Sequence, residues 1–195
     1  MSRKGRSAKT REEILDSAWD LLTVQGADVS ISDIAQAVGI SRQAVYLHFG
    51  TRGGLLMALV KRADERFTIR EDFFAALDLP LPAERLDACL QVWLAFVPKI
   101  LPVAKDLIRL RATDPDAAAA WEDRMSDLRS WLQQLVESLQ VEEALASSWT
   151  IEAATDYLWV ASSVQVWDLL VVERNWQPER AEIVVRQAIA KILLK

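Results

Sequence analysis

The chain has 195 residues, of which 51% are hydrophobic and 26% charged, so it can bury a sizeable core and is not a disordered polypeptide. Its single cysteine and single histidine exclude an intrachain disulfide and argue against a protein-bound transition metal. No long uncharged apolar run and no leader pattern stands out, so we expect a cytoplasmic protein that contacts no membrane.

The net charge of −5 is divided unevenly along the chain. Residues 1–66 carry ten Lys and Arg against eight Asp and Glu, whereas residues 67–195 carry thirteen against twenty. The basic excess is greatest at the front, where Arg3, Lys4, Arg6 and Lys9 precede any acidic residue. We predict that residues 1–9 form a basic arm that lies along DNA phosphates, with a solubilising tail as the alternative.

The next elements are three short helices. The run from Thr10 to Glu13 has the form of a capping box and predicts a first helix that ends at Gly26. A second capping box, Ser30-Ile31-Ser32-Asp33, starts a short helix that stops at Gly39, and Ser41 caps a third helix. Two short helices joined by a tight glycine-containing turn are typical of a helix-turn-helix, whose second helix enters the DNA major groove.

Residues 14–60 resemble the DNA-binding domain of the TetR (tetracycline repressor) family of bacterial regulators. The resemblance covers about the first third of the chain. It rests on the Gly26 turn, Ile34, Ala35, Val38, Gly39, Ile40, Ser41, Tyr46, His48, Phe49, Leu55 and Leu56. It implies an all-α fold of about nine helices, with a helix-turn-helix domain over residues 10–56 and a helical ligand-binding and dimerisation domain over residues 57–195.

The resemblance implies that the third helix contacts DNA. Arg42, Gln43 and Tyr46 would face the groove, because Arg pairs with guanine and Gln with adenine at roughly 1–3 kcal/mol of discrimination each. Tyr46 and His48 would hydrogen-bond phosphates, although both side chains also fit a packing role between the third and fourth helices. The predicted DNA-binding residues are Ser30, Ser32, Ser41, Arg42, Gln43, Tyr46, His48, Thr51 and Arg52.

The fourth helix is expected to begin with Thr51 as its cap and Arg52, Gly53 and Gly54 as its first turn, whose free amides would form a phosphate site. Arg52 keeps the charge of the lysine common there in the family, whereas Gly53 departs from a common acidic residue. Each glycine costs a helix roughly 1 kcal/mol relative to alanine. We therefore expect the pair to serve either a close approach to DNA or relief of crowding against the first helix.

The rest of the chain predicts helices over residues 85–101, 103–113, 116–139, 148–174 and 179–194. Seven of the eight tryptophans lie there, and each is either a core residue or a ligand contact. Arg111 and Asp168 interrupt apolar stretches, and each either lies at a solvated edge or faces a ligand. From the helices that line the cavity in similar proteins, the candidate pocket residues are Trp93, Phe96, Leu110, Arg111, Trp131 and Trp159.

The last two helices have more apolar surface than one core needs, and pairing across a two-fold axis would give the four-helix bundle that the family uses. The predicted interface residues are Tyr157, Ala161, Val164, Val171, Ile183, Ala188, Ile189 and Ile192. Such a dimer holds its recognition helices roughly 34–36 Å apart, which predicts a palindromic operator.

These features predict a homodimeric repressor that binds operator DNA and is released by a small, largely apolar effector, with no cofactor and no metal. The alternative is a helix-turn-helix regulator whose C-terminal domain serves dimerisation or a protein partner without an effector. An enzyme is not expected, because the sequence shows no nucleophile paired with a base and its only histidine lies in the DNA motif.

Overall fold

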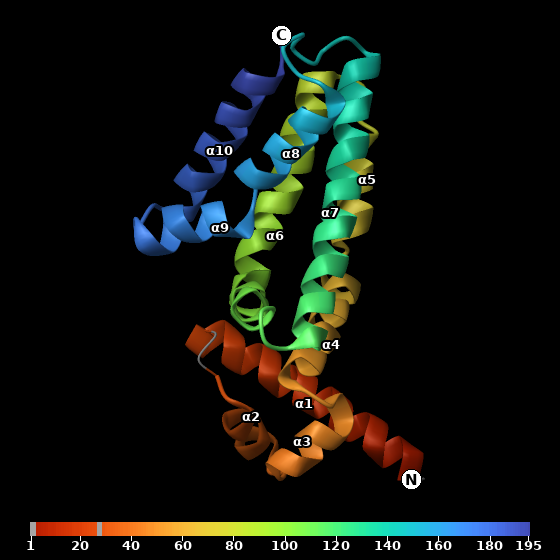
Figure 1. The fold of residues 1–195 in the computed structure, drawn as a ribbon, viewed down its shortest axis with the longest axis vertical. Helices are drawn as coiled ribbons and strands as arrows, with labels where there is room; N and C mark the ends of the chain where they lie inside the picture. The colour runs from red at the N-terminus through yellow and green to blue at the C-terminus, as the bar shows by residue number, and fades with distance from the viewer. Residues whose placement is uncertain (1–2, 27–28) are drawn as a thin grey trace. The chain divides into compact units, whose positions relative to one another are not determined.

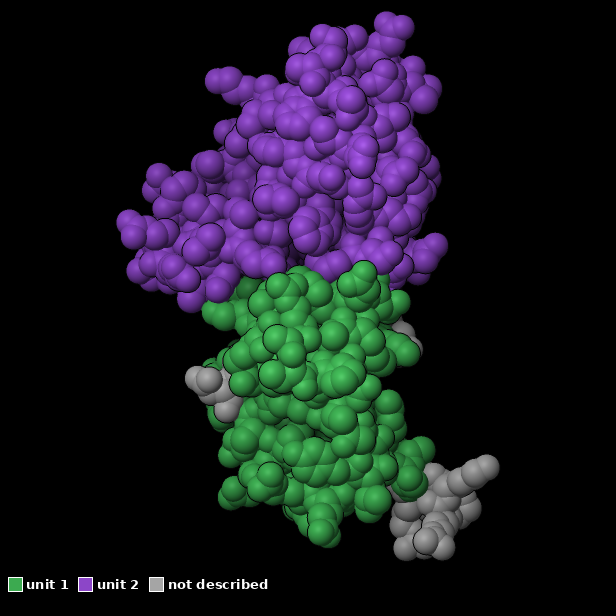
Figure 2. Space-filling view, viewed as in Figure 1, with its two compact units in different colours: residues 1–66, 99–123 green, residues 67–98, 124–195 purple. Residues whose placement is uncertain are grey.

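The computed structural model describes residues 3–26 and 29–195, and the described chain is built from helices, as expected (Figure 1). It divides into two compact units (Figure 2). Unit 1 comprises Met1–Arg66 and Lys99–Asp123, and unit 2 comprises Phe67–Pro98 and Arg124–Lys195. The boundary predicted between residues 56 and 57 falls inside the fourth helix.

Unit 1 begins with α1 (Arg3–Gln25), α2 (Ile31–Val38), α3 (Arg42–Phe49) and α4 (Arg52–Phe67). The helix start predicted at Thr10 is wrong, because α1 already begins at Arg3. Residues 3–9 are therefore the first turns of α1, and the contact of this basic segment with DNA phosphates stays a prediction.

The helix ends predicted at the glycines of unit 1 are confirmed. Gly26 and Gly39 follow α1 and α2 with φ values of 77° and 73°, in the left-handed region that favours glycine. The core between these helices is built from apolar side chains at helical spacing. Ile14, Leu15 and Ala18 of α1 are at most 2% exposed, as are Ile34 and Val45.

The remaining helices are α5 (Ile69–Leu77), α6 (Pro82–Leu110), α7 (Pro115–Val141), α8 (Ile151–Ala161), α9 (Val164–Trp167) and α10 (Pro178–Leu193), with a π-helix η2 (Asp168–Glu173) after α9. The helix α5 was not predicted from the sequence. The predicted break at Pro102 is wrong, since α6 runs through both Pro98 and Pro102. Each proline removes one helical hydrogen bond, and the buried apolar face of α6 offsets that loss.

The single helix predicted over residues 148–174 is also wrong. It is interrupted after α8, where Ser163 starts α9 by accepting a hydrogen bond from the Val166 amide. The last helix, α10, is close to its prediction and lies beside α8 within unit 2 (Figure 1).

By length and composition alone, α6 is apolar enough to cross a membrane. Its apolar face is nevertheless covered by protein in this fold, because Leu86, Leu90 and Leu94 are at most 1% exposed. Burial of this kind is what a core helix shows.

Candidate nucleic-acid interface

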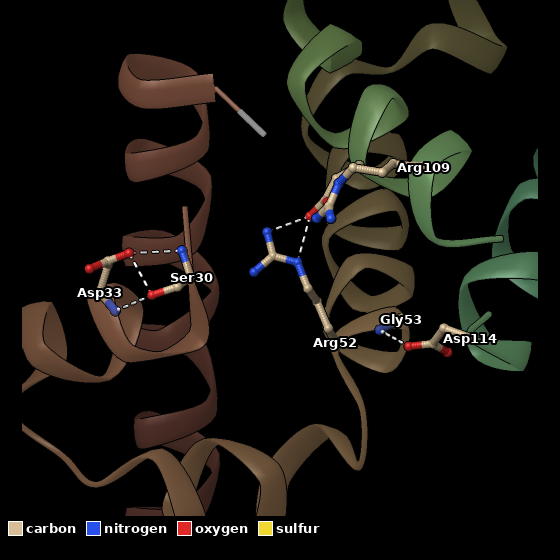
Figure 3. Close-up of polar contacts among 7 residues, drawn as sticks. Ser30, Asp33, Arg52, Gly53, Arg109 and Asp114 are labelled. Atoms are coloured by element: carbon tan, nitrogen blue, oxygen red, sulfur yellow. Dashed lines mark hydrogen bonds and ion pairs between the residues drawn. The ribbon is translucent and has the colours of Figure 1, made fainter. Parts of the chain in front are cut away.

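The capping box predicted at the start of α2 is present. The Ser30 amide donates to Asp33 Oδ2 at 2.8 Å, and the Asp33 amide donates to Ser30 Oγ at 3.2 Å (Figure 3). The Ser30 hydroxyl also donates to Asp33 Oδ2 at 2.6 Å. These hydrogen bonds, from the Ser30 side chain and then its backbone, lower the pKa of Asp33. Ser30 and Ser32 are both exposed, but the Ser30 hydroxyl is engaged in its own helix cap.

A tight turn connects α2 to α3. The Gly39 amide donates to the Gln36 carbonyl oxygen at 3.1 Å, and the Ile40 amide donates to that of Ala35 at 2.9 Å. Ser41 then caps α3 by accepting a hydrogen bond from the Ala44 amide at 3.2 Å. The spacing between the two helices is that of a helix-turn-helix.

The α3 helix is anchored on one side and exposed on the other. Val45 is 1% exposed and holds α3 to the core of unit 1. Arg42 and Gln43 are exposed, and Tyr46 is 40% exposed, as a groove-facing surface requires. Leu47 is 87% exposed and belongs to the same surface. Leu47 was not among the DNA-binding residues predicted from the sequence.

His48 has a mixed environment. Its side chain is half-buried, and its ring centroid lies 6.2 Å from that of Phe49. Part of the His48 side chain therefore packs against Phe49, and a phosphate contact by the His48 ring stays a prediction.

The first turn of α4 differs most from the prediction. Arg52 Nε donates to Asp106 Oδ2 at 2.7 Å, and a second guanidinium nitrogen contacts the same oxygen. The other oxygen of Asp106 accepts from Arg109 Nη2 at 2.5 Å. Asp106 is fully buried, and the Arg52 side chain is 16% exposed. Arg52, predicted to bind phosphate, is thus bound to a carboxylate of its own chain.

The neighbouring donors are occupied in the same way. Thr51 Oγ1 caps α4 by accepting from the Gly54 amide at 2.9 Å, as predicted, but it also donates to Asp116 Oδ2 at 2.6 Å. The Gly53 amide donates to Asp114 Oδ2 at 3.0 Å. The anion at the start of α4 is therefore supplied by residues 106–117, here named the α6–α7 corner, which lie in unit 1 with α4.

This corner also explains the glycine pair. A Cβ atom on Gly53 would overlap the Ala117 amide nitrogen and lie 2.5 Å from Asp114 Oδ1, and one on Gly54 would overlap the Phe49 carbonyl oxygen. The prediction that the pair relieves crowding against α1 is wrong. The close neighbours are the α6–α7 corner and the end of α3, and no approach to DNA is needed to account for either glycine.

The predicted pocket residues are divided between the two units. Leu110 and Arg111 belong to unit 1, where the exposed Arg111 guanidinium lies 5.5 Å from the Trp121 ring centroid. Trp93, Phe96, Trp131 and Trp159 belong to unit 2.

Three of the four predicted pocket residues in unit 2 have structural roles. Trp93 is buried and its Nε1 donates to the Ser162 carbonyl oxygen at 2.8 Å, and its ring lies 6.0 Å from that of Phe96. Trp131 packs against Phe73, with ring centroids 5.6 Å apart. Trp159 differs, because its Nε1 is buried and has no hydrogen-bond partner within the described part of the chain. Asp168, at the start of η2, is half-buried.

The predicted dimer residues divide between core and surface. Val164 and Ile189 are 3% and 1% exposed within a single chain, which corrects their assignment to an interface. Tyr157 and Ala161 are half-buried, as is Val171. The exposed apolar side chains of α8, η2 and α10 include the predicted Ile183 and Ile192, together with Val160, Leu169, Val172 and Val184. Ala188 is exposed as well.

A capped helix pair with an exposed polar second helix defines this chain as a helix-turn-helix DNA-binding protein. Residues 14–59 match the family model described as bacterial regulatory proteins, tetR family. The match covers the helix-turn-helix part of unit 1, so this part of the chain is similar to the DNA-binding domain of TetR-family transcriptional regulators.

Curated relatives agree with this assignment. The chain is 39% identical over 72 residues to the HTH-type transcriptional regulator AlkX of Mycobacterium tuberculosis, a match that covers 36% of this chain and 33% of AlkX. It is 29% identical over 164 residues to the HTH-type transcriptional repressor BepR of Brucella suis, covering 80% of this chain and 78% of BepR. The chain thus spans only about a third of AlkX, and both relatives are named as regulators and not as enzymes.

The same fold occurs in solved structures. A transcriptional regulator of Saccharomonospora viridis in complex with choline superposes with a TM-score of 0.75 at 16% identity, covering 96% of this chain and 99% of that one. At this level of identity the likeness shows the fold.

Proposed function

We propose that the chain is a homodimeric, cytoplasmic transcriptional repressor that binds a palindromic operator and is released by a small molecule. The exposed face of α3 carries this proposal. Arg42 and Gln43 present donors and acceptors to solvent, and Leu47 presents an apolar surface, while Val45 fixes the helix from behind. These side chains suit direct contact with base edges in the major groove.

Dimerisation is supported by the apolar surface of α8, η2 and α10. Val160, Leu169, Val172, Ile183 and Ile192 are each 43–54% exposed. Monomeric proteins rarely leave so many large apolar side chains exposed on neighbouring elements. Burying this surface against a second copy would place two recognition helices on one DNA duplex.

Release by a small molecule is supported by Trp159. Its buried Nε1 donor lacks a partner within the described residues, and an unsatisfied buried donor costs roughly 1–3 kcal/mol. A ligand with a hydrogen-bond acceptor and an apolar body would satisfy it. The S. viridis relative in fold holds choline in its structure, and BepR is named as a repressor.

Selection from a library of random-sequence duplexes tests DNA recognition. The purified protein should enrich one palindrome, and Gln43→Ala should change the preferred base at one position in each half-site. Gln36→Ala, which truncates an exposed glutamine on α2, is the matched control and should leave the preference unchanged. Enrichment of no sequence, or equal preference for Gln43→Ala and the native protein, would contradict this assignment of α3.

Calorimetry with a panel of apolar molecules tests release. A compound that binds should weaken operator affinity by the same factor by which operator weakens compound affinity, since the two couplings are reciprocal. Trp159→Phe keeps an aromatic ring but removes the donor, and should weaken compound binding roughly two- to tenfold, the worth of one hydrogen bond. Compound affinities that are equal with and without operator would leave a regulator without a small-molecule effector.

A further inference from the structure

We propose that Arg52 exchanges between Asp106 and DNA phosphate, so that the present conformation is the DNA-released state and the α6–α7 corner competes with DNA for the start of α4. Arg109 keeps Asp106 paired when Arg52 leaves. This inference rests on the proposed DNA binding and adds a regulatory contact to it.

Protein carboxylates occupy the donors that would otherwise bind phosphate. Arg52 is bound to Asp106, and the Gly53 amide donates to Asp114. An arginine next to the free amides of a helix N-terminus is a standard arrangement for binding phosphate. Carboxylate and phosphate present similar oxygens to a guanidinium. The α6–α7 corner therefore holds α4 with the chemistry that a DNA backbone would use.

The second ion pair of Asp106, with Arg109, lowers the energetic cost of releasing Arg52. Removing one partner from a buried ion pair usually costs about 3–5 kcal/mol, because the remaining charge is left unpaired. Asp106 is fully buried, but its second oxygen already accepts from Arg109 at 2.5 Å. Arg109 is 59% exposed and has room to shift further over the carboxylate. Loss of Arg52 thus leaves Asp106 with a cation.

The exchange makes the Arg52–Asp106 contact and DNA binding oppose each other. The Arg52 edge formed by Nε and one terminal nitrogen holds the carboxylate, so this edge must leave Asp106 before it can hold a phosphate. DNA binding must loosen Arg52 from the α6–α7 corner, and anything that tightens this corner on α4 must weaken DNA binding.

The test uses the full-length protein and a random-sequence duplex, with affinity measured over a series of salt concentrations. Asp106→Asn keeps the size and an acceptor but removes the charge that holds Arg52, and should raise affinity up to about tenfold, the worth of roughly one phosphate contact near 0.1 M salt. Arg52→Ala in the Asp106→Asn background should abolish the gain and make the dependence of log affinity on log salt shallower by about 0.9 per protomer. Asp16→Asn is the matched control, because it makes the same charge change at another aspartate–arginine pair of unit 1.

The outcomes separate the inference from the proposed function. Equal gains for Asp106→Asn and Asp16→Asn, or a gain that survives Arg52→Ala, would overturn the exchange while leaving DNA binding intact. A loss of affinity in Asp106→Asn with an unchanged thermal midpoint would show that the pair only positions α4. Failure of the native protein to bind any duplex would overturn the proposed function and the exchange with it.

A measurement on the native protein guards against a variant that fails to fold. The Arg52 Nε–H resonance, assigned by its absence in Arg52→Lys, should move on addition of the random duplex as its acceptor changes from Asp106 to phosphate. An unmoved Arg52 resonance in saturated protein would contradict the exchange.

Discussion

Replacing Gly53 by alanine tests the close contact between α4 and the α6–α7 corner. The new Cβ atom would overlap the Ala117 amide nitrogen and lie 2.5 Å from Asp114 Oδ1. Neither neighbour can move freely. Ala117 is part of the first turns of α7, and the Asp114 carboxylate is held by the amides of Gly53, Asp116 and Ala117.

Two effects of opposite sign decide the result. Alanine in a helix is favoured over glycine by about 1 kcal/mol, which would stabilise the variant. Overpacking a rigid site costs about 1–3 kcal/mol, and the upper end applies when the neighbours are fixed. The net expectation is a free energy of unfolding lowered by about 2 kcal/mol. For a chain of this length that corresponds to a thermal midpoint lower by roughly 4–8 °C.

Circular dichroism during thermal and urea unfolding measures the change. Ala119→Gly, at an exposed position of α7, calibrates the propensity effect alone and should cost about 1 kcal/mol. If Gly53→Ala instead raised the stability by the same amount, α4 would not contact Asp114, and the proposed competition for the start of α4 would lose its structural basis.

Three further predictions concern single side chains. Leu47→Ala should remove the discrimination between thymine and uracil at one operator position, which is roughly 0.8 kcal/mol for one methyl group. Competition with a uracil-substituted operator measures this discrimination, and equal values for the native protein and Leu47→Ala would show that Leu47 does not contact the groove. Burial raises the pKa of the Cys89 thiol to about 12, so a maleimide at pH 8 should label Cys89 only through unfolding, and rapid labelling of the native protein would contradict this. The free energy of unfolding should also fall between pH 9 and about 12, because the thiol ionises first in the unfolded chain. The Ser30 hydroxyl is the chief cause of the lowered pKa of Asp33, so the capping box should stabilise α2 above pH 3.8 and lose its contribution as the pH falls through the lower folded value. The loss should appear as a lower protection of the Asp33 amide against exchange, relative to its intrinsic rate at each pH. Ser30→Ala should show a weaker pH dependence of this protection.

The parts of the fold that depend on local signals were predictable from the sequence. Ser30 and Asp33 lie three residues apart, and Gly39 follows the helix that they start, so capping and termination of α2 are encoded within ten residues. The errors lie where local signals compete with packing. Pro102 reads as a break, but buried residues on both sides of it keep α6 continuous. Thr10 reads as a cap, but α1 extends past it to Arg3.

The start of α4 could not be predicted for a different reason. Its residue types indicate an anion site correctly, since Arg52 and the Gly53 amide both bind oxygen anions. The sequence does not indicate whether that anion is a DNA phosphate or a carboxylate of the same chain, because Asp106 lies 54 residues from Arg52 and Asp114 lies 61 residues from Gly53. The same donors that suit a phosphate suit a carboxylate of the chain itself, and only the fold brings the two together. Under the proposed exchange, DNA would have to displace Asp106 from Arg52, and the strength of that ion pair would then set the affinity for DNA.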